Sequence, residues 1–278
     1  MNSVEICLVY CDELNHELLR NLSNANNVRT FNFEINSDNK EIDEYIFRND
    51  LIITDFKSEN LLNEFYLFYK KWLSTKVDWN NKISWFDIST CSLETINKIG
   101  SDQSIDFVDG SILNLTDDST QGILILSGNQ EISETVVSNS FKDFFRNVFY
   151  LGEKFVSKIY KNAFLISIAG NAMALAEVFK YCEVKQLDFN KVLDIVDDGA
   201  GSSTFLQIFG NSVMWQNFKP SNLSISRLIE EYDILINHSK INLNVVNCFK
   251  ECLEELENKS LGIESIVKYY NDKSGNNV

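Results

Sequence analysis

The first half of the chain alternates short apolar runs with amphipathic stretches. The apolar runs cover residues 4–9, 28–33, 50–54, 83–88, 105–108 and 123–126. Between them, residues 13–22 and 61–73 place apolar side chains at the three- and four-residue spacing of a helix. Apolar strands that alternate with helices are typical of a parallel sheet covered on both faces. The pattern therefore predicts an α/β fold, with a doubly wound parallel sheet over residues 1–150.

Residues 151–278 are predicted to be helical throughout. Residues 158–180 contain no proline and few charges, and apolar side chains lie on nearly every face, which predicts one long buried helix. Further helices are predicted over 188–196, 205–216, 223–239, 245–259 and 261–270, with Ser221 and Asn222 as caps after Pro220. We expect a Rossmann-like domain followed by an all-helical C-terminal domain that a long interdomain helix leads.

The charge and the cysteines narrow the choice of partners. The 25 Lys and Arg residues against 40 Asp and Glu residues give a net charge of −15, which repels phosphate backbones and anionic membranes. We therefore expect neither nucleic acid nor a membrane as a partner. No run of 18 apolar residues and no basic N-terminal flank is present, so a cytoplasmic protein is expected. Six cysteines without a C-x-x-C pair and only two histidines predict reduced thiols and no metal site.

Four stretches resemble the β-hydroxyacid dehydrogenase superfamily, which includes 6-phosphogluconate dehydrogenase, and within it the imine reductases. They are Asp87-Ile-Ser-Thr, Phe107-Val-Asp-Gly-Ser-Ile, Ile123-Leu-Ile-Leu-Ser-Gly, and Tyr150-Leu-Gly-Glu followed by Ile159-Tyr-Lys-Asn-Ala-Phe-Leu. The resemblance implies a homodimer with intertwined helical domains and a small-molecule site built by both subunits. It also implies hydride transfer between NAD(P)H and a C=N or C=O bond.

The resemblance further implies the acid–base residues. Dehydrogenases of this superfamily use a Lys near the start of the long helix and an Asn four residues later, which Lys158 and Asn162 match. One helical turn places both on one face, so that the ammonium can protonate an oxygen that the amide orients. Imine reductases place the proton donor after a Leu-Tyr pair, a position that Lys161 holds after Tyr160. Both alignments stay open, and Tyr160 is expected to point inward from an apolar helix.

Three other positions are candidates for binding the substrate. In the stretch after Phe107, Asp109 and the small Ser111 match the segment that holds the substrate in the superfamily. Leu113 stands where the dehydrogenases have a hydroxyl, which argues against a carboxylate-binding pocket. In the helix after Pro220, Tyr232 could donate a proton into the site or pack in the core of the dimer.

Three more positions are candidates for binding a cofactor. Ser89 and Thr90 match the strand end that faces the cofactor in the superfamily. Glu34 follows the second apolar run, about 20 residues after the expected phosphate-binding turn, where an acid accepts the ribose hydroxyls of NAD. It could equally be a solvated carboxylate at the end of a strand. No Arg stands just after it to hold the 2′-phosphate of NADP.

The expected phosphate-binding turn departs from the superfamily. Such a turn needs three glycines, for the tight turn, for the approach of the pyrophosphate and for helix–strand packing. Here the three positions hold Tyr10, Asp12 and Asn15, with Glu13 adding a second negative charge. Each unit repulsion costs on the order of 4 kcal/mol at a few ångströms and an effective dielectric near 20. The sequence therefore predicts that NAD(P)H binding is impaired or lost, and that no cofactor is bound.

Three functions remain open at this point. The first is non-redox acid–base chemistry on a small imine, enamine or carbonyl compound, or simple binding of it, in an interdomain cleft of a dimer. The second is an NAD(P)H-dependent imine or carbonyl reductase with a remodelled cofactor site. The third is a catalytically inactive dimer that serves as a scaffold or partner of another enzyme. Titration with NADH and NADPH separates the first two, and replacing both Lys158 and Lys161 by Ala tests the third.

Overall fold

The structure is a computed structural model that describes residues 5–10, 28–33, 45–76, 82–113, 122–136, 141, 144–219 and 224–274. The chain divides into two compact units, Met1–Lys161 and Asn162–Val278. The division falls inside helix α6 (Ser157–Lys185), later than the predicted boundary at residue 150. The reason is that the first turn of α6 hydrogen bonds with the strands of the first unit.

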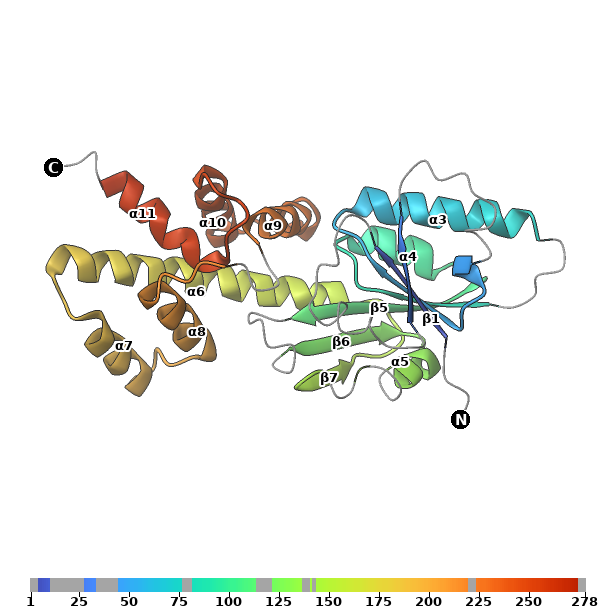
Figure 1. Cartoon of the computed structure of the whole chain (residues 1–278), viewed down its shortest axis with the longest axis horizontal. Helices are drawn as coiled ribbons and strands as arrows, with labels where there is room; N and C mark the ends of the chain where they lie inside the picture. The colour runs from blue at the N-terminus through green and yellow to red at the C-terminus, as the bar shows by residue number, and fades with distance from the viewer. Residues whose placement is uncertain are drawn as a thin grey trace. The chain divides into compact units, whose positions relative to one another are not determined.

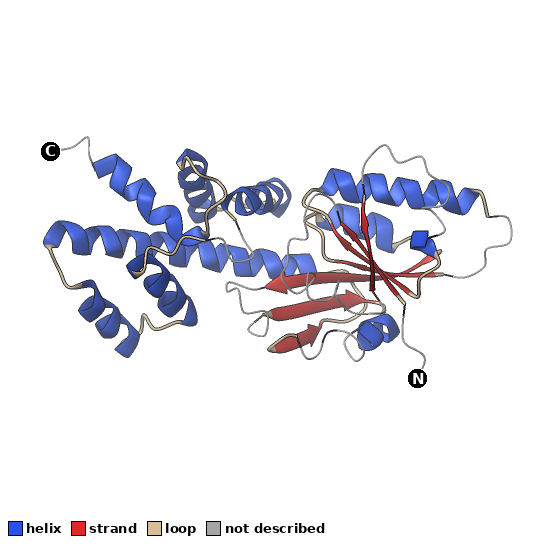
Figure 2. Cartoon of the chain, viewed as in Figure 1, coloured by secondary structure: helices blue, strands red, loops and turns tan. Residues whose placement is uncertain are grey.

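Within the described residues, the first unit contains one seven-stranded sheet (Figure 2). Its strands are β1 (Ile6–Tyr10), β2 (Val28–Asn32), β3 (Leu51–Asp55), β4 (Ile83–Asp87), β5 (Ile105–Leu113), β6 (Ile123–Gly128) and β7 (Asn147–Tyr150). Their spatial order is β2-β1-β3-β4-β5-β6-β7. Strands β1 to β5 are parallel, whereas β6 is antiparallel to β5 and β7 runs parallel to β6. The parallel sheet is therefore confirmed for five strands, and the last two reverse direction.

Both faces of this sheet are covered, as expected of a doubly wound fold (Figure 1). Along β1, Cys7 and Val9 belong to one apolar cluster and Ile6 and Leu8 to another, because successive strand residues point to opposite faces. Helices α3 (Glu59–Ser74) and α4 (Leu93–Gly100) pack on the first cluster, and α5 (Gln130–Val136) packs beside the second. The predicted helix over 61–73 is thereby confirmed, and the one over 13–22 lies outside the described residues.

The second unit is helical, which confirms the predicted all-helical C-terminal region. After α6 it contains α7 (Phe189–Asp198), α8 (Thr204–Met214), α9 (Ile225–Ser239), α10 (Asn244–Glu255), a 3₁₀ turn (Ile263–Ser265) and α11 (Ile266–Ser274). The cap of α9 differs from the prediction. Its N-cap is Ser224, whose Oγ accepts a hydrogen bond from the Arg227 amide, while Ser221 and Asn222 lie outside the described residues.

Helix α6 is less buried than its composition predicts. Only 28% of its most apolar 18-residue window is buried, and Tyr181 and Val184 near its end are exposed. By length and composition alone the helix could cross a membrane, a test that core helices of soluble proteins also pass. The expectation that a single chain buries most faces of α6 is wrong, since the helices of the second unit cover only part of its circumference.

Candidate functional site

Polar side chains gather where the parallel strands end. Thr54 of β3, Asp87 of β4 and Asp109 of β5 lie in register across the sheet. The strand order reverses between β1 and β3, whose last residues Tyr10 and Asp55 are also in register. In open α/β sheets, ligands bind outside the carboxyl ends of the strands at such a reversal. The candidate site is therefore this edge of the first unit.

Lys158 reaches these strand ends from the first turn of α6. Its Nζ donates hydrogen bonds to the main-chain carbonyls of Ser89 and Gly110, each at 2.8 Å. The nearest carboxylate oxygens are Asp87 Oδ2 at 3.6 Å and Asp109 Oδ1 at 3.7 Å. The lysine side chain is 5% exposed and both aspartates are fully buried. Two carbonyls and two carboxylates thus surround a single ammonium.

Asp87 is held by hydroxyl groups of the neighbouring strands. Its Oδ1 accepts hydrogen bonds from Thr54 Oγ1 at 2.7 Å and from Ser89 Oγ at 2.6 Å. The Trp85 indole donates in turn to Thr54 Oγ1 at 2.8 Å. Because every member of this chain of hydrogen bonds is buried, the position of the carboxylate is fixed from several sides.

Asp109 joins the sheet to the start of α6. Its Oδ2 accepts hydrogen bonds from the Ser157 amide at 2.9 Å and from Ser127 Oγ at 3.1 Å. Among the described residues its Oδ1 accepts no hydrogen bond, and it faces Lys158. Burial raises the pKa of Asp109, an effect that the Lys158 ammonium and the Ser157 hydrogen bond oppose. Ser111 Oγ lies 3.1 Å from Ser157 Oγ at the same helix start.

Cys91 also belongs to this cluster, although it is not one of the predicted site residues. Its Sγ lies 3.9 Å from Asp87 Oδ2 and 3.6 Å from the carbonyl of Ser89. Burial raises the pKa of Cys91 well above its usual value, so the side chain is a neutral thiol. The signal in the sequence was its place just after the Asp87-Ile-Ser-Thr stretch.

Four of the predicted site residues lie together in the first unit. They are Lys158, Asp109, Ser111 and Ser89. Thr90 comes next in the chain, and its amide donates to the carbonyl of Phe56 at 2.9 Å, which anchors the segment after β4. The structure thus gathers the candidates from three separate stretches of the sequence.

The remaining residues of the long helix are placed differently from one another. Lys161 is buried one turn after Lys158, near enough to Cys91 for its charge to lower the pKa of that thiol. Asn162 is partly buried and begins the second unit. Tyr160 is 53% exposed, so the expectation that it points inward is wrong for the single chain. This geometry favours Lys158 over Lys161 as the acid–base group of the site at the strand ends.

Tyr232 lies in the core of the helical unit. Its hydroxyl donates to the main-chain carbonyl of Leu165 at 3.0 Å, and its ring packs edge-on against Phe249. Burial raises the pKa of Tyr232, which makes the phenol a poorer acid. This placement supports packing and not the predicted contact with a substrate.

Several predicted cofactor residues lie outside the described residues. They are Glu34 and three residues of the expected phosphate-binding turn, Asp12, Glu13 and Asn15. Tyr10, the first position of that turn, is the partly buried last residue of β1. Among the described residues no group of three or more potential ligands could hold a metal ion.

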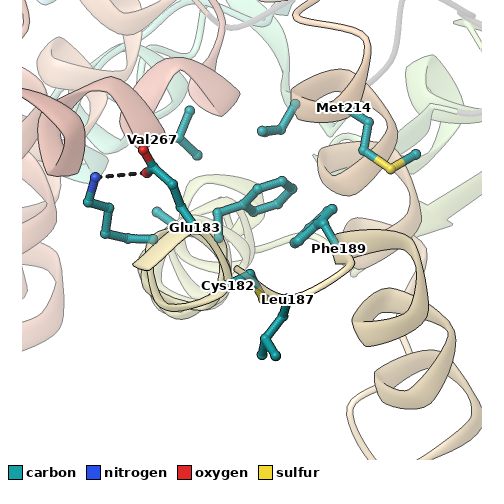
Figure 3. A pocket seen from close by; sticks show the side chains of 10 residues that line it. Cys182, Glu183, Leu187, Phe189, Met214 and Val267 are labelled. Carbon is teal, nitrogen blue, oxygen red and sulfur yellow. Dashed lines mark hydrogen bonds and ion pairs between the residues drawn. The ribbon is translucent and has the colours of Figure 1, made fainter. Parts of the chain in front are cut away.

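A separate pocket of about 320 Å³ opens in the second unit between α6, α7, α8 and α11 (Figure 3). Most of its lining is apolar: Ala176, Phe179, Leu187, Phe189, Val213, Met214 and Val267, together with Cys182. Lys180 and Glu183 form an ion pair of 2.7 Å at its edge. Burial raises the pKa of Cys182, so this pocket suits apolar contacts better than acid–base chemistry.

Solved structures share this fold over nearly their whole length. A Mycobacterium tuberculosis 3-hydroxyisobutyrate dehydrogenase with L-serine is 12% identical with a TM-score of 0.80, covering 97% of this chain and 99% of that one. Psf3 in complex with NADP+ and 2-OPP is 12% identical with a TM-score of 0.74, covering 95% and 99%. An imine reductase from Myxococcus stipitatus in complex with NADP+ is 9% identical with a TM-score of 0.56, covering 96% and 99%. No protein-family model and no curated protein matches the sequence.

These comparisons correct one prediction and confirm another. The prediction that no cofactor is bound is wrong, because solved structures with this fold include complexes with NADP+ and NAD+. The three substituted glycine positions had suggested the opposite. The resemblance to the β-hydroxyacid dehydrogenases and imine reductases is confirmed, because the chain has the fold of these enzymes.

Proposed function

We propose that the protein is an NAD(P)H-dependent oxidoreductase that interconverts a small carbonyl or imine compound with the corresponding alcohol or amine. The observation that supports this most is the position of Lys158. Its buried ammonium donates to two carbonyls, one after β4 and one in β5. These strands follow β3 in the sheet, and the order of strands reverses between β3 and β1, where such sheets bind ligands. Several solved structures with this fold were determined with nicotinamide dinucleotides, which supports a cofactor of that class for this proposal.

The donor set of the site fits this cofactor chemistry. Bound nicotinamide supplies the hydride for reduction, or accepts it in the reverse direction. Lys158 gives a proton to the oxygen or nitrogen on which hydride transfer leaves negative charge, and takes it back in the reverse direction. Ser89 and Thr90, which follow β4 at the same edge, are the described residues that we assign to the cofactor side of the site. With the cofactor bound, Lys158 would thus serve the oxygen or nitrogen end of the double bond, while the nicotinamide would supply hydride to its carbon.

We expect the phosphate-binding turn to be remodelled. Its sequence lacks the glycines that usually let the main chain come close to the pyrophosphate. The pyrophosphate therefore has to be bound by a main-chain arrangement that does not depend on glycine. Glu34 would bind the ribose hydroxyls of NADH, and no Arg stands just after it in the sequence for the 2′-phosphate of NADPH. This predicts a preference for NADH.

Titration with NADH and NADPH tests the cofactor proposal. We expect saturable quenching of tryptophan fluorescence by both nucleotides, with NADH binding about tenfold more tightly, equivalent to about 1.4 kcal/mol. Glu34→Gln should reduce that preference, because the amide loses the charge that the ribose hydroxyls meet. Absence of binding of either nucleotide up to about 1 mM, a free energy of about −4 kcal/mol, would refute the proposal.

We also propose that two copies of the chain form a homodimer through the apolar surface of the second unit. Large apolar side chains are exposed there, including Trp215 at 80% and Ile195 at 71%. The apolar pocket of Figure 3 opens beside the first of these, since Val213 and Met214 line it. We take these exposed side chains and the pocket to belong to one apolar surface, since large exposed apolar patches mark interaction sites.

Light scattering tests the dimer. We expect a mass of about 64 kDa for the protein, twice the 32.0 kDa of one chain. Trp215→Asp should shift the equilibrium towards the monomer, because buried Trp residues contribute about 2 kcal/mol or more at such interfaces. Leu67→Asp, which changes an exposed side chain on α3 of the first unit, is the matched control and should leave the mass unchanged. A wild-type protein that is monomeric at 50 µM, roughly a −6 kcal/mol threshold, would contradict the proposal.

A further inference from the structure

Two buried carboxylates share the ammonium of Lys158. Asp87 and Asp109 lie in register on neighbouring parallel strands, and their carboxylates approach the same ammonium at 3.6 and 3.7 Å. Among the described residues, two other titratable groups lie near the cluster: the neutral Cys91 thiol after β4, and the ammonium of Lys161 on the next turn of α6. All of these groups are buried, so water screens their charges weakly.

The two carboxylates are not equivalent. Two hydroxyl groups donate to Asp87 Oδ1, and they stabilise its charge independently of the lysine. Asp109 Oδ2 accepts hydrogen bonds from the Ser157 amide at the start of α6 and from Ser127 Oγ. Its Oδ1 has no hydrogen-bond donor among the described residues. The charge at Asp109 Oδ1 is therefore balanced mainly by the Lys158 ammonium. The charge of Lys158 is stabilised in turn by the Asp109 carboxylate.

We propose that Asp87 and Asp109 are positioning residues that keep Lys158 protonated at the strand ends, and that Asp109 contributes the larger part. An opposite charge within about 4 Å favours the charged form of a lysine, and a second one adds to the effect. The ammonium is then retained at pH values at which an isolated buried lysine would lose its proton. The use of this ammonium as a proton donor rests on the proposed function, whereas its protonation state does not.

Lysine NMR measures the protonation state directly, without substrate or cofactor. The full-length protein is labelled with [13Cε]lysine, and the Lys158 signal is identified by its absence from the Lys158→Arg variant. We expect the wild-type signal to show no titration up to about pH 10.4, the usual value for lysine. In Asp109→Asn the midpoint should fall by about one to three pH units, the usual effect of removing an opposite charge at this distance. Asp87→Asn should lower it less.

A matched control and a rescue separate charge from structure. Asp106→Asn removes a carboxylate from the same strand, where Asp106 pairs with the exposed Lys82, and should leave the Lys158 midpoint unchanged. Asp109→Glu restores the charge and should recover at least half of the shift. Each variant is first shown to be folded by circular dichroism. A folded Asp109→Asn whose Lys158 midpoint moves by less than about 0.3 units would overturn the proposal, and a larger shift in Asp87→Asn would overturn the ranking.

Kinetics connect this device to the proposed function. If the protein reduces a substrate, the alkaline limb of kcat should move to lower pH in Asp109→Asn by the same interval as the NMR midpoint. KM should change by less than about threefold, because the carboxylate acts through the lysine and does not touch the substrate. An unmoved limb alongside a shifted NMR midpoint would overturn Lys158 as the proton donor. An unchanged NMR midpoint of Lys158 in Asp109→Asn would overturn the positioning role of Asp109. The proposed function would then be tested separately, by the titration with NADH and NADPH.

Discussion

Replacing Lys158 by Arg is expected to lower kcat by about 10²- to 10⁴-fold, the range that general acid catalysis contributes. The guanidinium keeps the positive charge that Asp87 and Asp109 require, so the variant should fold. It remains protonated under all ordinary conditions and therefore cannot deliver a proton. KM should change little, because the loss falls on the transition state.

Two further variants define this result. Lys158→Met removes the charge and leaves two buried carboxylates uncompensated, at a cost of about 3–5 kcal/mol of stability, so it should lose both activity and thermal stability. Lys154→Met changes an exposed lysine just before α6 and should retain both. Steady-state kinetics in both reaction directions provide the measurement. Activity of Lys158→Arg within threefold of the wild type would show that another group donates the proton.

Gly128→Ala is expected to destabilise the first unit by about 2–6 kcal/mol. Gly128 ends β6 with φ +109°, a conformation that L side chains rarely adopt and that costs them about 1–3 kcal/mol. A Cβ there would also lie 2.5 Å from the carbonyl oxygen of Phe107 and 2.8 Å from the ring of Phe155, and such overpacking costs about 1–3 kcal/mol more. These close contacts can be relieved only if β6 moves. Such a movement would disturb the start of α6, because Ser127 of β6 accepts hydrogen bonds from the amides of Val156 and Ser157.

The control for this variant is Gly152→Ala. Gly152 has φ +97°, but nothing lies within 4 Å of the position its Cβ would take, so it should pay only the backbone strain. Urea unfolding followed by tryptophan fluorescence measures the free energy of unfolding of both variants. Both glycines lie in the first unit, which contains the buried Trp85. Equal losses in the two variants would show that the contacts with Phe107 and Phe155 relax freely.

The local pattern of the sequence was sufficient for most elements of the fold. The strand Leu51–Asp55 begins with three consecutive apolar residues, as expected of a strand that is buried on both faces. The short strand Asn147–Tyr150 escaped prediction because it is mostly exposed at the edge of the sheet. The reversal of β6 could not be predicted either, since the direction of a strand leaves no trace in its own residues.

The site was predictable in its main residues but not in its contacts. Lys158, Asp109, Ser111 and Ser89 could be identified from the resemblance. The pairing of Asp87 with the lysine depends on the register of β4 against β5, which no local pattern contains. The predicted orientation of Tyr160 was wrong because α6 has apolar residues on all sides. The sequence of a helix without a polar face does not indicate which side is buried.

The unbroken course of α6 determines how the molecule can be divided. A fragment that stops at residue 150 would contain every strand of the sheet, yet it would lack the ammonium that neutralises Asp87 and Asp109. Its two carboxylates would have to take up protons or open to water. The sheet is therefore not a self-sufficient module: its charge balance is completed by the opening turn of the helix that leads into the other half of the chain.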